Sequence, residues 1–142
     1  MKIAIACDHG GYALKTEIIR HLNSKGCEVK DFGSYDDNSC DYTDYAHTAC
    51  AAVQSGECEH AILICGTGIG MSIAANKLRG IRAALCGDCF SAMATREHND
   101  ANVLCLGARV TGPSLALMIV DTFISTPFSN SPRHIRRISK IE

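Results

Sequence analysis

Short runs of residues that are apolar at every position alternate with longer stretches of helical period along this sequence. The clearest runs are Ile3–Ala6, Ala61–Ile64 and Val103–Leu106. A central strand of a parallel sheet is covered by helices on both faces, so it shows no alternation of apolar and polar residues. The pattern therefore predicts a doubly wound α/β domain with right-handed crossovers.

The same reading places individual elements along the chain. Strands are predicted at Lys2–Cys7, Cys27–Phe32, His60–Cys65, Arg82–Cys86 and Val103–Leu106. Helices are predicted at Tyr12–Ser24, Tyr42–Ser55, Gly70–Lys77, Cys89–His98 and Pro113–Ser125. The basic stretch Arg133–Ile141 predicts a final helix, whose buried face would be formed by Ile135, Ile138 and Ile141.

Length and charge favour one domain over residues 1–142 without a nucleic-acid or membrane partner. The net charge is −1, and no long basic run provides a nucleic-acid footprint. No apolar stretch has the length of a membrane span, and the apolar run at the N-terminus is too short for a secretory signal. We therefore expect a cytoplasmic protein.

The nine cysteines are predicted to be small core residues in a reducing compartment. Their number is odd and several lie within apolar runs, which does not fit a disulfide framework. Cys86 and Cys89 form the only C-x-x-C pair, and no second ligand pair accompanies it, so no metal site is expected. Cys7 and Cys65 both end predicted strands, and if these strands are neighbours, oxidation would join or cap the two thiols.

The glycine-rich segment Cys65–Gly70 joins a predicted strand to a predicted helix. Glycines let backbone N–H groups turn toward a bound anion, and a helix N-terminus adds partial positive charge. That charge also favours the thiolate form of a cysteine placed there. The segment is therefore either a base beside an oxyanion cradle or a tight turn with a buried cysteine. It lacks the Lys-Ser/Thr pair that ends a P-loop, and its glycine spacing differs from that of dinucleotide-binding loops. A nucleotide site is therefore only weakly indicated.

Two other polar clusters follow predicted strands, at the edge of an open α/β sheet where ligands bind. Asp8–Gly11 follows the first strand and offers an acid/base pair with a backbone anion site; alternatively, Asp8 is a helix N-cap. Gly107–Arg109 follows the fifth strand. Four histidines have no evident partner in the sequence and are read as surface or core residues: His21, His47, His60 and His134.

Three further features have both a functional and a structural interpretation. Arg133 and Arg137 are four residues apart, so their guanidinium groups share a helix face that suits a phosphate dianion or is simply solvated. His98 and Asn99 could supply an acid and a contact to a sugar hydroxyl, or could interact with and cap a helix C-terminus. Tyr42 could pack against a sugar or be an ordinary half-buried tyrosine.

These clusters, in this order, resemble the type B ribose-5-phosphate isomerases, a family that also includes the subunits of galactose-6-phosphate isomerase. The resemblance runs almost end to end, through Ala6–Gly11, Ser39–Tyr42, Cys65–Lys77, Gly80–Cys86, His98–Leu104, Leu106–Val110 and Arg133–Arg137. It implies a Rossmann-like three-layer domain with a five-stranded parallel sheet and a C-terminal helix. It also implies interconversion of ribose 5-phosphate and ribulose 5-phosphate through an enediolate, with no metal or cofactor. The partner implied is a second copy of the chain, in a homodimer with shared active sites that could pair further into a tetramer.

The resemblance assigns roles to individual residues. It implies that Cys65 is the base that moves a proton between C1 and C2, and that backbone N–H groups hold the enediolate oxygen, from Gly66, Gly68 and Gly70. Ring opening and proton relay fall to Asp8, Thr67 and His98. The residues implied to bind phosphate are His9, Arg109, Arg133 and Arg137. Those implied to contact the sugar are Tyr42 and Asn99, and the residues implied to come from the partner subunit are His98, Asn99 and Arg109.

Some relatives use a glutamate base from the following helix instead of this cysteine, but residues 69–74 hold no acid. The chain departs from the family pattern at Ser131-Pro132, where Gly-Gly is usual, and at Thr43, where proline is common. Both changes bear on substrate choice more than on reaction class. Alternative functions are therefore an allose-6-phosphate or galactose-6-phosphate isomerase, a non-catalytic sugar-phosphate sensor on the same fold, and a nucleotide-binding or thiol-redox protein.

Overall fold

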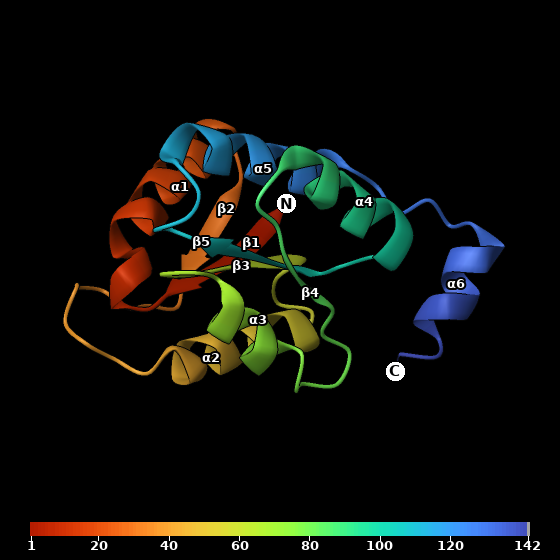
Figure 1. Ribbon diagram of the computed structural model, residues 1–142, viewed down its shortest axis with the longest axis horizontal. Helices are drawn as coiled ribbons and strands as arrows, with labels where there is room; N and C mark the ends of the chain where they lie inside the picture. Colours follow the sequence, from red (N-terminus) through yellow and green to blue (C-terminus); the bar gives the residue numbers. More distant parts are fainter. Residues whose placement is uncertain (142) are drawn as a thin grey trace.

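The computed structural model describes residues 1–141 as an α/β fold (Figure 1). Its strands are β1 (Lys2–Cys7), β2 (Glu28–Asp31), β3 (His60–Cys65), β4 (Ala83–Leu85) and β5 (Val103–Gly107). A short 3₁₀ turn, η1 (His9–Gly11), precedes α1 (Tyr12–Ser24). The remaining helices are α2 (Tyr42–Gln54), α3 (Ile69–Ala75), α4 (Cys89–Asn99), α5 (Pro113–Ser125) and α6 (Pro132–Ile138). No helix in this part of the chain is both long and apolar enough to span a membrane.

The five strands form one parallel sheet in the order β2-β1-β3-β5-β4. Helices α1, α4 and α5 cover one face and α2 and α3 cover the other, as Figure 1 shows. The predicted Rossmann-like three-layer fold with a five-stranded parallel sheet is therefore confirmed. Element bounds differ from the predicted ones by one to three residues at several ends, which is the usual uncertainty of a helix or strand terminus.

The core explains why the central strands are apolar throughout. On β1, Ile3, Ile5 and Cys7 pack beneath α1 and α5, whereas Ala4 and Ala6 face α2. Successive residues of a strand point to opposite faces, so both sets are buried when helices cover both sides. Each fully buried isoleucine contributes about 1.5–3 kcal/mol relative to an exposed one.

The predicted encounter of Cys7 with Cys65 is wrong. The strands β1 and β3 are neighbours, but Cys7 is paired with Ile64 rather than with Cys65. An offset of one residue sends the two side chains to opposite faces of the sheet. Cys7 lies in the core beneath α1 and α5, and Cys65 lies in the core above α2 and α3.

Helix α3 ends earlier than predicted, at Ala75 instead of Lys77. The reason is local, because the side chain of Asn76 bonds the backbone across the following turn. Its Oδ1 accepts from the Ala83 N–H at 2.8 Å, and its Nδ2 donates to the Ala83 carbonyl at 2.9 Å. This two-way bond joins the end of α3 to the edge strand β4.

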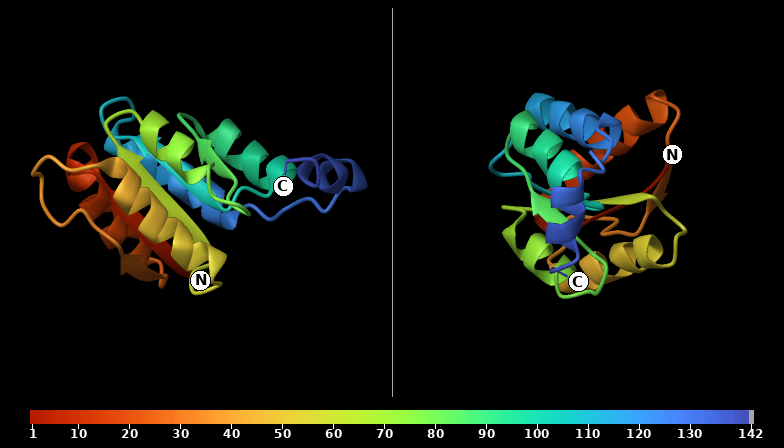
Figure 2. Two further views of the ribbon diagram at one scale, coloured as in Figure 1. Left: turned by 90° about the horizontal axis from the view of Figure 1, so that it is seen from below. Right: turned by 90° about the vertical axis from the view of Figure 1, so that its right-hand side faces the viewer.

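Helix α6 begins at Pro132, one residue before the predicted start, because proline is favoured at the first position of a helix; it ends at Ile138 instead of Ile141. Its predicted buried face is wrong. Ile135 is 50% exposed and Ile141 is 63% exposed, and His134 is instead the buried residue of the helix. Figures 1 and 2 give the reason: α6 projects from one end of the molecule beside α4, so most of its surface meets no core of this chain.

Candidate active site

Cys65 is the last residue of β3, and the glycine loop that follows folds back over its sulfur. The Gly68 N–H donates to Cys65 Sγ at 3.0 Å, and the cysteine is only 5% exposed. Gly68 has a φ of +78°, and a Cβ there would lie 2.5 Å from Leu85 Cδ1. Only glycine satisfies both conditions. An N–H group aimed at the sulfur stabilises negative charge on it.

The segment Asp8–Gly11 meets this loop backbone to backbone. A Cβ on Gly10 would lie 3.2 Å from the Gly66 nitrogen, and one on Gly11 would lie 2.6 Å from the Ile64 oxygen. Asp8 Oδ1 accepts from the Gly10 N–H at 2.8 Å, so Asp8 is a cap as the structural interpretation predicted. The carboxyl group nevertheless lies where β1 and β3 end side by side, next to the loop.

Tyr42 and His9 both lie near the start of α2, where His9 of η1 contacts the residues that precede the helix. Tyr42 opens α2 and its ring packs on Gly70, where a Cβ would lie 2.7 Å from Tyr42 Cζ. The imidazole of His9 accepts through Nδ1 from the Cys40 N–H at 3.4 Å. With Nδ1 accepting, Nε2 carries the proton of the neutral ring and is available as a donor.

Arg109 lies against the glycine loop of its own chain, whereas the resemblance assigned it to the partner subunit. The loop after β5 pairs with the loop after β3, because Ala108 N–H donates to the Cys65 carbonyl and Arg109 N–H to the Gly66 carbonyl, both at 2.9 Å. A Cβ on Gly66 would lie 3.5 Å from Arg109 Nη1. Thr67 is exposed at the loop tip, where its Oγ1 accepts from the Ile69 N–H at 3.3 Å. We call these residues the loop group: Asp8, His9, Tyr42, Cys65–Gly70 and Arg109.

His98 and Asn99 lie at the other edge of the sheet. Helix α4 begins after β4 and runs back toward the start of β5, and its eleven residues span about 16 Å. The turn that follows is held by Asp100, which has a φ of +46° and accepts from Arg96 Nη1 at 2.9 Å. Arg82 Nε donates to the Asn99 and Asp100 carbonyls, both at 3.0 Å.

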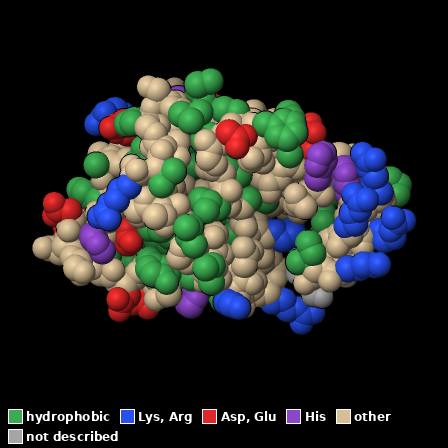
Figure 3. Space-filling model, viewed as in Figure 1, with side chains coloured by type: hydrophobic (Ala, Val, Ile, Leu, Met, Phe, Trp, Pro, Cys, Tyr) green, Lys and Arg blue, Asp and Glu red, His purple; other side chains and the backbone are tan. Residues whose placement is uncertain are grey.

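Helix α6 adds its arginines to this edge. Arg133 and Arg137 are exposed, and they belong to the cluster of basic side chains that Figure 3 shows over α6. Between them, His134 packs its ring on His98 with 4.6 Å between the centroids. Burial lowers the pKa of His134, and the charges of His98 and the two arginines lower it further. We call these residues the helix-end group: His98, Asn99, Arg133, His134 and Arg137.

The structure therefore divides the predicted site residues into two groups within one chain. The loop group comes together because parallel strands end at one edge of the sheet. The helix-end group gathers at the opposite edge because a crossover helix returns the chain there. His134 was missed by the sequence reasoning, which left it without a partner; its place between Arg133 and Arg137 was the available signal.

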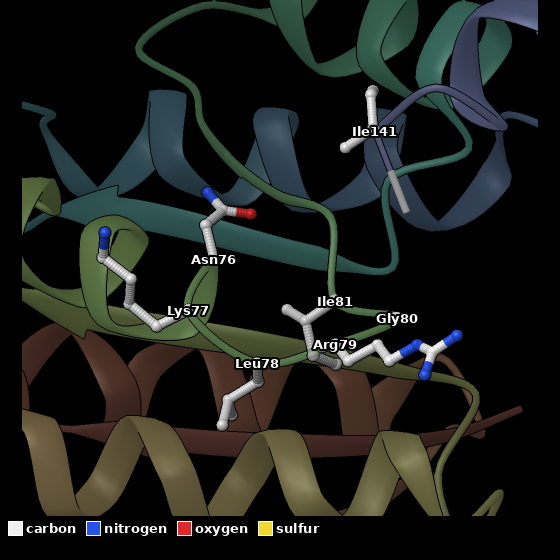
Figure 4. A pocket seen from close by; sticks show the side chains of 7 residues that line it. All are labelled: Asn76, Lys77, Leu78, Arg79, Gly80, Ile81 and Ile141. Atoms are coloured by element: carbon white, nitrogen blue, oxygen red, sulfur yellow. The ribbon is translucent and has the colours of Figure 1, made fainter.

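Open space adjoins the helix-end group. A cavity of about 320 Å³ is lined by residues 76–81 and by Ile141, which lies on the opposite side of the open space in Figure 4. A neighbouring cavity is lined in part by Arg82, Asn99 and Ile141. Within residues 1–141, no three His, Cys, Asp or Glu side chains are grouped so that they could hold a metal ion.

Comparison with known proteins agrees with this architecture. The sequence matches the family described as Ribose/Galactose Isomerase over residues 3–141. It is 49% identical to ribose-5-phosphate isomerase B of Escherichia coli, with 99% of this chain and 93% of that protein covered. A putative sugar phosphate isomerase of Bacillus subtilis is 51% identical, with 99% and 95% covered.

The solved structure of ribose-5-phosphate isomerase B from Clostridium thermocellum has a TM-score of 0.98 and 54% identity, with 99% of this chain and 95% of that chain covered. The type B enzyme of Trypanosoma brucei has a TM-score of 0.96 and 47% identity, with 99% and 95% covered. The chain is thus a sugar-phosphate isomerase. It belongs to the ribose/galactose isomerase family, and within that family to the type B ribose-5-phosphate isomerases.

Proposed function

We propose that this enzyme interconverts ribose 5-phosphate and ribulose 5-phosphate without a metal, and that Cys65 is the base. The observation that carries the proposal is the 3.0 Å hydrogen bond from the Gly68 N–H to Cys65 Sγ inside the glycine loop. One segment thus offers a sulfur base and backbone donors side by side. The choice of ribose 5-phosphate as the substrate rests on the relatives from Escherichia coli and Clostridium thermocellum, both of which are named ribose-5-phosphate isomerase B.

The proposed reaction begins with the furanose form of ribose 5-phosphate. His98, as an acid, protonates the ring oxygen while the C1 hydroxyl gives its proton to the Asp8 carboxylate, which opens the ring to the aldehyde. The Cys65 thiolate then removes the C2 proton, and the electron pair moves through C1 to the aldehyde oxygen, giving the enediolate. Backbone N–H groups of residues 66–70 stabilise that oxygen. Asp8 and Thr67 move a proton between the two oxygens, and Cys65 returns its proton to C1.

The proposal requires two copies of the chain, because the helix-end group and loop group lie at opposite edges of the sheet. We infer a homodimer in which His98, Asn99, Arg133 and Arg137 of one copy complete the site of the other. There Arg133 and Arg137, with His9 and Arg109, bind the phosphate, and Tyr42 and Asn99 contact the sugar. Arg133 and Arg137 form no ion pair with any acid among residues 1–141, which leaves them available for a phosphate.

Exposed apolar side chains near the loop group support the same dimer. Each of the following is at least 43% exposed: Ile69, Ile73, Leu85, Phe90 and Val110. Ile69 and Ile73 are four residues apart on α3 and share one helix face, and exposed apolar surface is typical of protein interfaces. We also propose that residues 1–142 act as one catalytic domain in the cytoplasm, since its nine cysteines are all free, as expected in a reducing compartment.

The first experiment measures formation of ribulose 5-phosphate from ribose 5-phosphate with a chelator present. The variant Cys65→Ser keeps an acceptor for the Gly68 N–H but lacks a basic thiolate, so kcat should fall at least ~100-fold. Cys50→Ala is the matched control, because Cys50 is fully buried on the same face of the sheet and takes no part in the reaction. Activity that persists in Cys65→Ser would exclude Cys65 as the base. No activity in the native protein would direct the assay to allose 6-phosphate and then to the sensor function.

A second experiment tests the shared site by mixing two inactive variants. Cys65→Ser and His98→Asn are combined, dissociated and reassociated. Half of the dimers then contain one copy of each, and in these one of the two sites has both native residues. The mixture should recover about a quarter of the native activity if sites are shared. If each chain carried a whole site, no activity would return.

A further inference from the structure

His134 is the buried residue of α6 and contacts α4. It is 5% exposed, although it lies on a helix whose other residues are at least partly exposed. Its ring meets the ring of His98 with 4.6 Å between the centroids and 45° between the planes. Imidazole is polar and α6 projects from the molecule, so hydrophobic burial does not explain why the His134 ring is buried between two arginines.

The orientation of the His134 ring is fixed by its own contacts. Its Nδ1 is 2.7 Å from Ser129 Oγ, and Ser129 N–H donates to the Glu97 carbonyl at 3.2 Å. Ser129 therefore connects His134 to the last turn of α4, where His98 lies. The hydrogen bond to Ser129 and the ring contact with His98 together restrict the orientation of the His134 side chain.

His98 has much weaker contacts of its own. Its side chain is 48% exposed, and its one ion-pair contact is Glu97 Oε2 at 3.9 Å from Nε2. Within residues 1–141, neither ring nitrogen of His98 has a hydrogen-bond partner, so the His134 ring is the contact that restricts its side chain. The charged and titratable groups around the pair are Glu97 on α4, with Arg133 and Arg137 on α6.

We propose that His134 is a positioning residue that holds the His98 imidazole in one orientation and joins it to Arg133 and Arg137; this inference rests on the proposed function. The same side chain would then fix the acid that opens the sugar ring relative to the arginines that hold its phosphate. A misplacement of about 1 Å in such an arrangement can lower the rate of the assisted step ~100-fold.

The test separates ring opening from proton transfer. Ribose 5-phosphate must be opened, whereas ribulose 5-phosphate is acyclic because its C5 oxygen carries the phosphate. Exchange of the C1 hydrogen of ribulose 5-phosphate with deuterated water therefore reports Cys65 chemistry without ring opening. In His134→Ala, kcat for ribose 5-phosphate should fall at least ~10-fold, and the exchange rate should stay within ~2-fold of native. His134→Phe keeps a ring against His98 and should restore most of kcat.

His47→Ala is the control, since His47 is an exposed histidine on α2 and belongs to neither group. The His98 ring resonances in NMR spectra provide a readout that does not depend on activity; they should shift in His134→Ala and stay unchanged in His47→Ala. Equal losses of isomerisation and exchange, or unchanged His98 resonances, would overturn the positioning role. A native protein inactive in both assays would overturn the proposed function, and the positioning role with it.

Discussion

Replacement of the buried Lys15 by methionine should destabilise the protein by about 3 kcal/mol. Lys15 is 1% exposed, and its ammonium donates to both Asp31 carboxylate oxygens at 2.7 Å and to the Ser34 carbonyl at 2.6 Å. Methionine fills similar space, so no large cavity forms. The variant loses the ion pair and the donor to the Ser34 carbonyl. Ser34 is only 3% exposed, so water cannot readily replace that donor.

Replacement of the partner carboxylate, Asp31, should destabilise the protein more than replacement of Lys15. Asp31→Asn leaves the Lys15 ammonium in the interior without its counter-charge, which costs about 3–5 kcal/mol. In Lys15→Met, by contrast, the Asp31 side chain is 31% exposed and still accepts from the Gly33 N–H, so water can solvate much of its charge. The expected order of stability is therefore native, then Lys15→Met, then Asp31→Asn.

Urea and thermal unfolding measure this order directly. A loss of about 3 kcal/mol corresponds to a fall in Tm of ~10 °C for a chain of this size. Lys30→Met is the control: Lys30 lies on the same strand as Asp31 and pairs with Glu57 at the surface, where a pair contributes only about 0–1 kcal/mol. A Lys15→Met variant as stable as Lys30→Met, or less stable than Asp31→Asn, would refute the reasoning.

Three further predictions rest on the packing of Gly70 against Tyr42 and on the burial of His60, Cys7 and Cys50. Gly70→Ala should lower kcat/KM at least ~10-fold, because the new Cβ would lie 2.7 Å from the Tyr42 ring and displace it; wild-type kinetics in this variant would contradict that role. Burial lowers the pKa of His60, so the unfolded chain binds a proton that the folded chain does not, and stability should decline as the pH falls below about 6.5. His60→Leu should weaken this pH dependence in urea unfolding at pH 5.5 and 7.5, and an unchanged dependence would exclude His60 as its source. Burial raises the pKa of Cys7 and of Cys50 to about 12, so neither thiol should react with a disulfide reagent at pH 8 until the protein is unfolded; labelling of either one in the folded protein would contradict their burial.

The sequence allowed the sheet and the loop group to be predicted, for the same physical reason. Strands buried on both faces have a characteristic apolar composition, and parallel strands carry the polar residues that follow them to one edge. Asp8, Cys65 and Arg109 could therefore be brought together without knowledge of any distance.

Other features depend on details that composition does not contain. The separation of Cys7 from Cys65 depends on a one-residue offset in pairing, which the strand ends alone do not specify. The exposure of Ile135 depends on where α6 lies relative to the core. The spacing of apolar residues in α6 predicts a helix but does not predict its position. His134 could not be paired with His98 from the sequence, because 35 residues and an entire strand and helix separate them.

The pairing of Cys7 with Ile64 also has a consequence for folding fidelity. A chain in which β1 slipped by one residue along β3 would turn every β1 side chain to the other face and set Cys7 opposite Cys65. In the correctly paired sheet the two thiols lie on opposite faces, so the sheet itself prevents them from meeting. An internal Cys7–Cys65 cross-link recovered after oxidative refolding would therefore record a misregistered chain, and its yield would measure how often β1 docks in the wrong register.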